Sequence, residues 1–425
     1  MKTLTNLVIL FSLLALPVEL WAFENLPDNG NMPDVVHLRK DCASTNPDLK
    51  NCADNMLDML NWVWDVRIPS ASSPLIIDIG PGEFDSFVCA GASDTNRKGW
   101  VTVRGSGQRI TTITGKPGGV FAPENNDLVG VEANFCTNLT FEDLTIAALD
   151  YGIAWTGGGT STWSNVEVAA ADDTRHQNIG WYENSCEGEK QGVHYWFGSR
   201  ITAHQDGTNR ANYLSCAETW FYGGEIAVIV SGDYFGSAVP VQLFNDGPHL
   251  GSMRMFGSAL RVVVPNGNTA PLAKVTGVLL RPEGTQFHMH GGIISIDASG
   301  STQSFNVSGI EVRNGSAHTP DTAFSVKAAG GGGNAKRVNL VGPAVTNFGA
   351  NVQSPYLWPA GSTPPSAASA KSGDDQFVEN DCSVGGNCNN GGNETHLMIS
   401  NPAKCGTTDP WFDTQVDQCR AVNTP

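Results

Sequence analysis

The sequence predicts an all-β chain folded as a solenoid, and three observations predict it. Short apolar alternations separated by Gly, Asn, Asp and Pro run from about residue 75 to residue 348, with few helical windows between them. Residues 144–150 match residues 166–172 at an offset of 22. A motif of an aromatic residue or His, then Gly, then Ser or Gly, any residue, and Ile or Leu occurs four times, starting at Phe197, Tyr222, Phe256 and His290.

These internal copies decide between two all-β architectures. Copies of about 20–35 residues, each with one or two short strands and a turn, are typical of β-solenoids. The glycines of the repeated motif are 25, 34 and 34 residues apart, which suits constant strands joined by loops of variable length. A β-sandwich is the alternative, with strands about every 8–12 residues but no alignable copies. The solenoid therefore explains the pattern better.

The N-terminal residues 1–22 have the features of a secretory signal peptide. Lys2 precedes an apolar stretch at 7–16, and small or apolar residues at 20–22 offer a cleavage site. No later stretch approaches 18 uninterrupted apolar residues, so no membrane span is expected. We therefore expect a secreted or periplasmic protein.

The rest of the chain divides by pattern into four parts. Residues 23–50 form an irregular lead-in, and residues 51–353 form the solenoid domain. The domain opens with apolar residues at helical spacing up to Val66, which predicts a capping helix. Residues 354–376 lose the pattern and indicate a linker, and residues 377–425 form a Cys-rich segment with little strand signal.

Charge and cysteine content narrow the classes of partner. With 25 Lys+Arg against 42 Asp+Glu, the net charge of −17 excludes a broadly basic nucleic-acid binder. We expect a monomer.

All ten cysteines follow the signal peptide, and an even number in an exported chain favours disulfides. The local candidates are Cys42 with Cys52, Cys89 with Cys136, and Cys186 with Cys216, which leaves Cys382, Cys388, Cys405 and Cys419 to pair among themselves.

The order of features over residues 51–205 resembles the pectin-lyase-like superfamily. An apolar helix is followed by a strand that runs into residues 79–84, then by residues 101–107, 112–115 and 138–146. This N-terminal half is similar to pectin methylesterase-type solenoids, although their catalytic motifs are not matched. The resemblance implies a right-handed parallel β-helix with an N-terminal capping helix, followed here by a disulfide-rich tail.

Acidic residues at the 22-residue offset are the candidate catalytic groups. One coil of a parallel solenoid advances by about 4.8 Å, so Asp150 and Asp172 would stack, with Asp173 beside them. His194, 22 residues after Asp172, could complete the stack as an acid or base. A carboxylate pair would suit a glycoside hydrolase, whereas Ca²⁺ bound to the three aspartates would suit a polysaccharide lyase. The competing interpretation is that Asp150 and Asp172 are turn residues and that His194 is structural.

Candidate substrate-binding residues lie in the same region. Arg175, His176 and Arg200 belong to the one stretch that leans basic and could bind anionic groups of a glycan. Aromatic residues expected on loops could stack on sugar rings: Trp181, Tyr182 and Tyr213. Those expected on strands, Trp163, Trp196 and Trp220, are predicted to form core ladders.

The sequence therefore predicts a secreted, polysaccharide-active β-helix protein. Cleavage of a glycan by a hydrolase or lyase is the leading hypothesis. The alternative is a non-catalytic glycan-binding or adhesin-type surface protein, which would keep the aromatic residues and tolerate loss of the acids.

Overall fold

The computed structural model describes most of the central chain and four C-terminal strands. The described residues are 26–27, 32–42, 51–93, 95–117, 128–148, 150–170, 179–186, 192–205, 211–230, 236–246, 249–272, 274–281, 285–312, 316–319, 322–332, 335–340, 356–359, 395–400, 411–413 and 418–420. The predicted signal peptide lies outside them.

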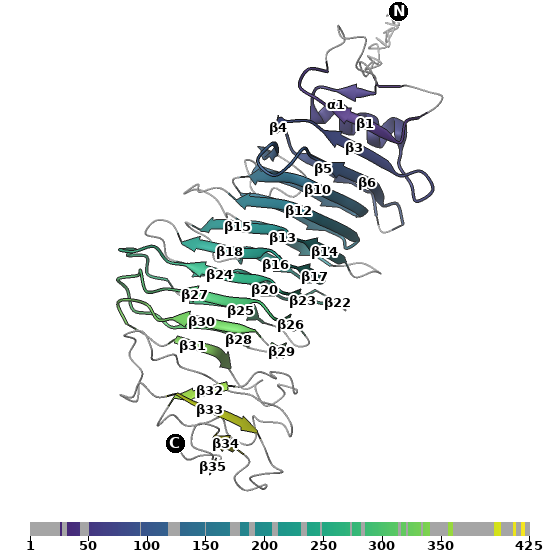
Figure 1. Ribbon diagram of the computed structural model, residues 1–425. Coiled ribbons are helices and arrows are strands. Elements are labelled where there is room, and N and C mark those ends of the chain that lie inside the picture. Colours follow the sequence, from purple (N-terminus) through teal and green to yellow (C-terminus); the bar gives the residue numbers. More distant parts are fainter. Residues whose placement is uncertain are drawn as a thin grey trace, which may run out of the picture.

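The central strands form parallel coils with three strand positions per coil, stacked along one axis (Figure 1). The first face consists of β1 (Val35–Leu38), β2 (Cys52–Ala53), β3 (Leu75–Ile79), β6 (Lys98–Arg104), β14 (Val193–Phe197), β17 (Glu218–Tyr222), β23 (Ser252–Phe256), β26 (Gln286–His290) and β29 (Ser316–His318). The second face consists of β4 (Gly82–Phe84), β7 (Thr111–Thr114), β15 (Arg200–Gln205), β18 (Glu225–Val230), β24 (Ala259–Val263), β27 (Ile293–Asp297) and β30 (Ala323–Lys327). The long strands β10 (Cys136–Ala148) and β12 (Thr160–Ala170) run through both faces.

A second sheet supplies the third face. It consists of β5 (Phe87–Ala90), β9 (Leu128–Asn134), β11 (Tyr151–Thr156), β13 (Ile179–Ser185), β16 (Tyr213–Ser215), β20 (Val241–Leu243), β25 (Lys274–Leu280), β28 (Val307–Val312) and β31 (Ala335–Leu340). Short strands flank the coils: β8 (Lys116–Pro117), β19 (Ser237–Ala238), β21 (Asn245–Asp246) and β22 (His249–Leu250). The parallel pairing of successive coils confirms the predicted β-helix.

The predicted capping helix lies at the N-terminal end of the stack (Figure 1). α1 (Met56–Trp62) begins at Asn55, whose side chain accepts a 2.9 Å hydrogen bond from the Asp58 backbone N–H. It continues as the π-helical turn η1 (Val63–Arg67). Its apolar side covers the otherwise open end of the core, because Met56, Met59, Leu60 and Trp62 are buried. No helix in the described part of the chain has the length and apolar character needed to cross a membrane.

The register explains the repeated motif. Leu144 pairs with Val166 at the predicted 22-residue offset, and Tyr195 pairs with Trp220 at the 25-residue offset. The motif glycines lie where each coil turns from the first face to the second, with positive φ at Gly198, Gly223, Gly257 and Gly291. In the longer strands Asp143 and Asn165 adopt the same left-handed conformation at this turn (φ 54° and 53°). The glycines are therefore structural.

Stacked aromatic residues fill part of the solenoid interior. Trp163 stacks on Trp196 with ring centroids 5.1 Å apart, and Trp181 stacks on Tyr213 at 5.5 Å. All four side chains are fully buried. The prediction that Trp163 and Trp196 form a core ladder is confirmed.

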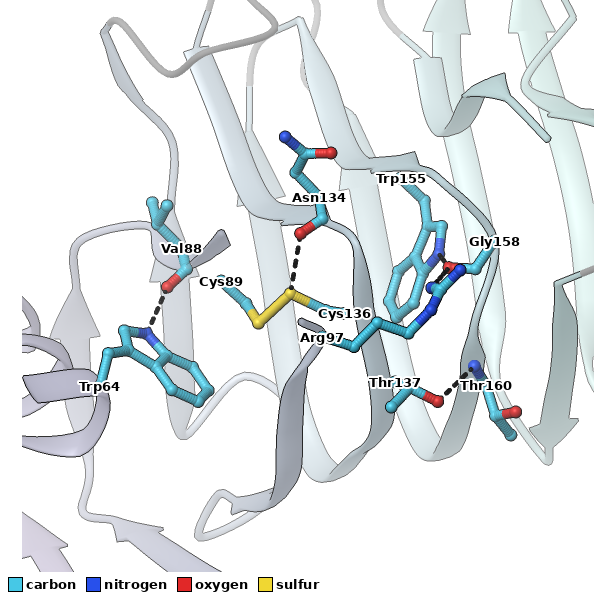
Figure 2. Close-up of a disulfide and its surroundings, with 10 residues drawn as sticks. All are labelled: Trp64, Val88, Cys89, Arg97, Asn134, Cys136, Thr137, Trp155, Gly158 and Thr160. Carbon is cyan, nitrogen blue, oxygen red and sulfur yellow. Dashed lines mark hydrogen bonds between the residues drawn. A yellow bond between two sulfur atoms is a disulfide. The ribbon is translucent and has the colours of Figure 1, made fainter. Parts of the chain in front are cut away.

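All three predicted local disulfides are present: Cys42–Cys52, Cys89–Cys136 and Cys186–Cys216. The second joins β5 to β10 across 47 residues. Figure 2 shows it with two nearby indole hydrogen bonds. Trp64 donates its indole N–H to the Val88 carbonyl at 2.9 Å on one side of the disulfide. On the other side, Trp155 donates to the Gly158 carbonyl at 2.9 Å.

The C-terminal strands form a separate antiparallel sheet. They are β32 (Tyr356–Pro359), β33 (Thr395–Ser400), β34 (Trp411–Asp413) and β35 (Gln418–Arg420). β32 falls within the stretch expected as a linker, and the other three fall where the sequence showed little strand signal. Cys382, Cys388 and Cys405 lie outside the described residues, and for Cys419 the backbone alone is described.

Candidate functional site

Asp150 is a buried structural group rather than a surface carboxylate. Its side chain is fully buried at the start of β11, and it accepts a hydrogen bond from the backbone N–H of Leu128 on the preceding coil. Its own backbone carbonyl accepts from the Ile179 N–H of the following coil at 2.8 Å. This geometry agrees with the turn-residue interpretation, because the carboxylate joins one coil to the next.

The remaining acids of the predicted stack cannot be placed. Asp172 and Asp173, together with Arg175 and His176, lie outside the described residues. Ca²⁺ takes about 6–8 oxygen ligands, and a buried Asp150 already bound to an N–H does not by itself fit such a site. Among described residues, the one cluster with metal-ligand spacing contains Glu183 and two sulfurs that form the Cys186–Cys216 disulfide, so it lacks free thiolates.

His194 does not lie at the position that a constant 22-residue step predicts. The step from β12 to β14 is 33 residues long, and it pairs His194 with Ser161. The expectation that a constant 22-residue step brings His194 into the stack is therefore wrong. The longer connection between these strands changes the register, so that His194, two residues before Trp196, lies opposite Ser161, two residues before Trp163.

His194 instead belongs to a polar network inside the core. Its Nδ1 lies 2.8 Å from the Ser161 hydroxyl, and its Nε2 lies 3.3 Å from a Glu183 carboxylate oxygen. Trp163 donates its indole N–H to the Ser161 hydroxyl at 2.7 Å, and Ser215 donates to Glu183. These side chains resemble a Ser–His–acid arrangement in composition, but solvent cannot reach them. The network therefore satisfies buried polar groups.

The aromatic residues predicted to bind substrate are mostly interior. Trp181 and Tyr213 are fully buried, so the expectation that they stack on a sugar is wrong. Burial raises the pKa of the Tyr213 hydroxyl, which bonds Thr219 at 2.9 Å. Tyr182 is half-buried on the third face, where its ring lies 5.1 Å from that of Tyr151.

Among the predicted site residues that the structure describes, Arg200 is exposed to solvent. It lies at the start of β15, immediately after the turn at Gly198, and its Nε lies 3.4 Å from Glu225. Arg261 bonds the same carboxylate at 3.0 Å from the far side. Glu167, opposite Arg200 on the preceding coil, makes a two-point contact with Arg109 at 2.9 and 2.8 Å. The second face thus carries a row of alternating charges.

A solvent-facing column of rings lies at the C-terminal ends of four strands of the first face. This column was not predicted from the sequence. Its members, here called the aromatic column, are Phe197, Tyr222, Phe256 and His290. Successive ring centroids are 5.2, 5.1 and 5.3 Å apart, and successive planes lie within 10° of each other. Each ring comes from one coil, so the column runs along the solenoid axis. Phe197 is 41% exposed and His290 is exposed.

A second outward column lies beside it, two residues earlier on each strand. Trp220 is half-buried there and lies between two aromatic-column rings, 6.3 Å from Tyr222 and 6.1 Å from Phe256. The Arg254 guanidinium covers the Trp220 ring at 4.6 Å, and Glu218 accepts hydrogen bonds from both at 2.6 and 2.8 Å. The prediction that Trp220 lies in the core is therefore wrong.

The missed column had a signal in the sequence. The residue before each motif glycine is aromatic or His in all four copies. Since side chains alternate along a strand, a residue one step after buried Trp196 must face outward. The glycines of the motif predict the turns between strands, and its first position predicts a row of outward-facing rings that the sequence analysis did not recognise.

Comparison with known proteins finds structural likeness among solved structures. No family model matches the chain, and no curated protein matches it. Among solved structures, the chain is similar to a pectin methylesterase from carrot, with 12% identity, a TM-score of 0.36, and coverage of 64% of this chain and 81% of that chain. The parallel coils themselves establish the β-helical fold that the sequence resemblance implied.

Proposed function

We propose that the protein binds an extended polysaccharide along the aromatic column and the adjacent column that contains Trp220. The observation that most directly supports this proposal is the row of outward-facing rings, whose successive centroids lie 5.1 to 5.3 Å apart. That step is close to the length of one sugar residue in an extended chain. Successive sugars can therefore make van der Waals contact with the edges of successive rings, while their hydroxyls reach the polar groups beside them.

The ends and the border of the column suit this ligand. The coil before Phe197 supplies Ser164 at the matching position, so no ring of the described residues is stacked on that face of Phe197. A sugar ring can stack there face to face, whereas the rings further along offer their edges. Arg254, Glu218 and Arg200 border the column and supply donors and acceptors for hydroxyl groups.

Binding, rather than cleavage, is the activity that the described residues support. The carboxylates bordering the column are each paired with an arginine: Glu218 with Arg254, and Glu225 with Arg200 and Arg261. Because an arginine occupies each of these carboxylates, neither is placed to protonate a glycosidic oxygen or to activate a water molecule, as the two carboxylates of a glycosidase do. The proposal therefore favours the non-catalytic alternative.

The compartment proposed for this activity is the cell exterior or the periplasm. The three disulfides among the described residues suit an oxidising compartment, where structural polysaccharides also occur. We propose that the protein acts there as a monomer.

A screen over neutral and acidic polysaccharides tests binding and cleavage together. Retarded migration in a gel that contains the polysaccharide, without new reducing ends and without new absorbance near 235 nm, is the expected result. New reducing ends would establish a hydrolase, and added absorbance near 235 nm would establish a lyase. Failure to bind any polysaccharide in the panel would overturn the proposal.

A further inference from the structure

The charges beside the aromatic column suit one class of polysaccharide. We infer that the bound chain is uncharged, because the Arg, Asp and Glu side chains that the described residues place along this surface are already paired with one another. This inference rests on the proposed binding function and narrows its ligand. It concerns two rows of outward-facing residues, the row that contains the aromatic column and the adjacent row that contains Trp220.

The row of the aromatic column continues toward the N-terminal coils as a polar row. Going back one coil at a time from Phe197, the matching positions are Ser164, Glu142, Arg104 and Asp78. Each of these four residues follows a buried residue on its strand, so its side chain points away from the core. A polysaccharide that extends past Phe197 along the solenoid axis therefore meets them in this order.

The charges of this polar row neutralise one another. Arg104 Nε lies 3.0 Å from a Glu142 carboxylate oxygen. Arg39 bonds the Asp78 carboxylate, which also lies 3.1 Å from His37 Nδ1. A sugar carboxylate that approached Arg104 would also approach Glu142, so repulsion from the carboxylate offsets attraction to the guanidinium. A sugar hydroxyl meets no such repulsion, because it can donate to the carboxylate or accept from the guanidinium.

The adjacent row supplies uncharged hydroxyl groups before it reaches Trp220. Its members there are Thr102, Thr140, Thr162 and Tyr195, which pair in register from coil to coil. All four are half-buried on the outer side of the first face. Hydroxyls both donate and accept hydrogen bonds, which matches the hydroxyl groups of a neutral sugar.

Arg254 is the arginine of the adjacent row, and a carboxylate of the protein engages it. Its guanidinium lies 2.6 Å from a Glu218 oxygen. An acidic sugar can bind this guanidinium only beside Glu218 or by displacing it, and both arrangements are unfavourable. Beyond the turn, Arg200 shares the Glu225 carboxylate with Arg261. The described arginines that border the column are thus bound to acids of the same chain.

Two pairs of polysaccharides that share a backbone but differ in charge test this inference. They are hydroxyethyl cellulose with carboxymethyl cellulose, and fully methyl-esterified pectin with polygalacturonate. With the full chain, the uncharged member of a pair should bind about threefold or more tightly than the acidic member. Its affinity should change by less than about twofold between about 0.05 and about 0.5 M NaCl, because salt screens charges. Tighter binding of the acidic members would overturn the inference.

Glu218→Gln is the sharpest variant, because glutamine keeps an acceptor for the Trp220 indole but removes the charge that engages Arg254. It should raise the affinity for carboxymethyl cellulose by about threefold or more at low salt, and adding Arg254→Gln should abolish that gain. Asp297→Asn is the matched control. Asp297 ends β27 on the second face and bonds Lys327 at 2.8 Å, so this variant frees a cation away from the column and should bind as the wild type does.

Failure of this inference can be distinguished from failure of the proposed function. A wild-type protein that prefers the acidic member of each pair still binds a polysaccharide, so the proposed function stands and this inference fails. A protein that binds no polysaccharide overturns both. If Glu218→Gln gained no affinity for carboxymethyl cellulose, or if Asp297→Asn gained as much, pairing of charges beside the column would not be what excludes acidic chains, and the inference would again fail.

Discussion

Tyr222 and Phe256 lie 34 residues apart in the chain, yet their rings stack 5.1 Å apart with planes 10° apart on the solvent side of adjacent coils. The step between the rings is set by the backbone, because β17 and β23 pair in register. The strand pairing therefore holds the stacked rings in fixed positions relative to one another. Rigid aromatic surfaces lose little conformational entropy when a ligand binds, which favours the binding role.

Asp150 should behave as a structural residue. Asp150→Asn keeps an oxygen that can accept the Leu128 N–H, so its free energy of unfolding should stay near that of the wild type. Asp150→Ala leaves that buried donor unpaired and should cost about 1–3 kcal/mol. Denaturant unfolding measures both. If Asp150→Asn were fully stable but lost a glycan-cleaving activity, the catalytic hypothesis for this residue would return.

His194 should also matter for stability and not for binding. Replacing it with Ala removes its contact with Ser161, opens a cavity and leaves Glu183 with one fewer partner inside the core. A loss of about 2–5 kcal/mol in unfolding free energy is expected. The surviving folded fraction should bind polysaccharide as the wild type does. A stable His194→Ala protein with impaired ligand affinity would contradict this assignment.

Two adjacent glycines in one turn should differ sharply in tolerance. A Cβ at Gly224 (φ +87°) would lie 2.0 Å from the Ser199 carbonyl oxygen, whereas a Cβ at Gly223 (φ +67°) meets nothing within 4 Å. Gly224→Ala must therefore distort the coil and should cost more than about 3 kcal/mol. Gly223→Asn should cost less than about 1 kcal/mol, because Asn tolerates the left-handed conformation. Thermal unfolding of both variants measures the difference, and equal costs would refute the turn geometry.

Low pH should weaken the ion pair between Glu167 and Arg109 on the second face. The hydrogen bond and charge of Arg109 hold the pKa of Glu167 below its usual value of 4.5. A carboxyl whose pKa is lower in the folded state stabilises the fold above its unfolded pKa, and that contribution disappears as pH falls through the folded pKa. Unfolding measured from pH 6 to pH 3 should therefore depend less on pH in Glu167→Gln than in the wild type. Identical pH profiles for the two proteins would contradict this role.

The sequence predicted the fold well because its periodicity reflects backbone geometry. The repeated glycines mark a turn that needs positive φ, and the matched segments around residues 144 and 166 pair as expected. The candidate site was predicted poorly for two physical reasons. One coil is 33 residues long instead of 22, which moved His194 into the core opposite Ser161. The sequence does not distinguish a large aromatic residue in the core from one on the surface. Trp181 was therefore expected on a loop but is buried, and Trp220 was expected in the core but lies on the outer side of its strand.

The affinity of a responsive polysaccharide for single variants of the aromatic column tests the central claim most directly. Tyr222→Ala removes the ring between Phe197 and Phe256 and should weaken binding by about fivefold or more, equivalent to about 1 kcal/mol. Ile110→Ala removes an apolar side chain that is 52% exposed at a turn near the N-terminal end, away from the column, and should leave the affinity unchanged. Unchanged affinity in Tyr222→Ala, with the protein folded, would contradict the account.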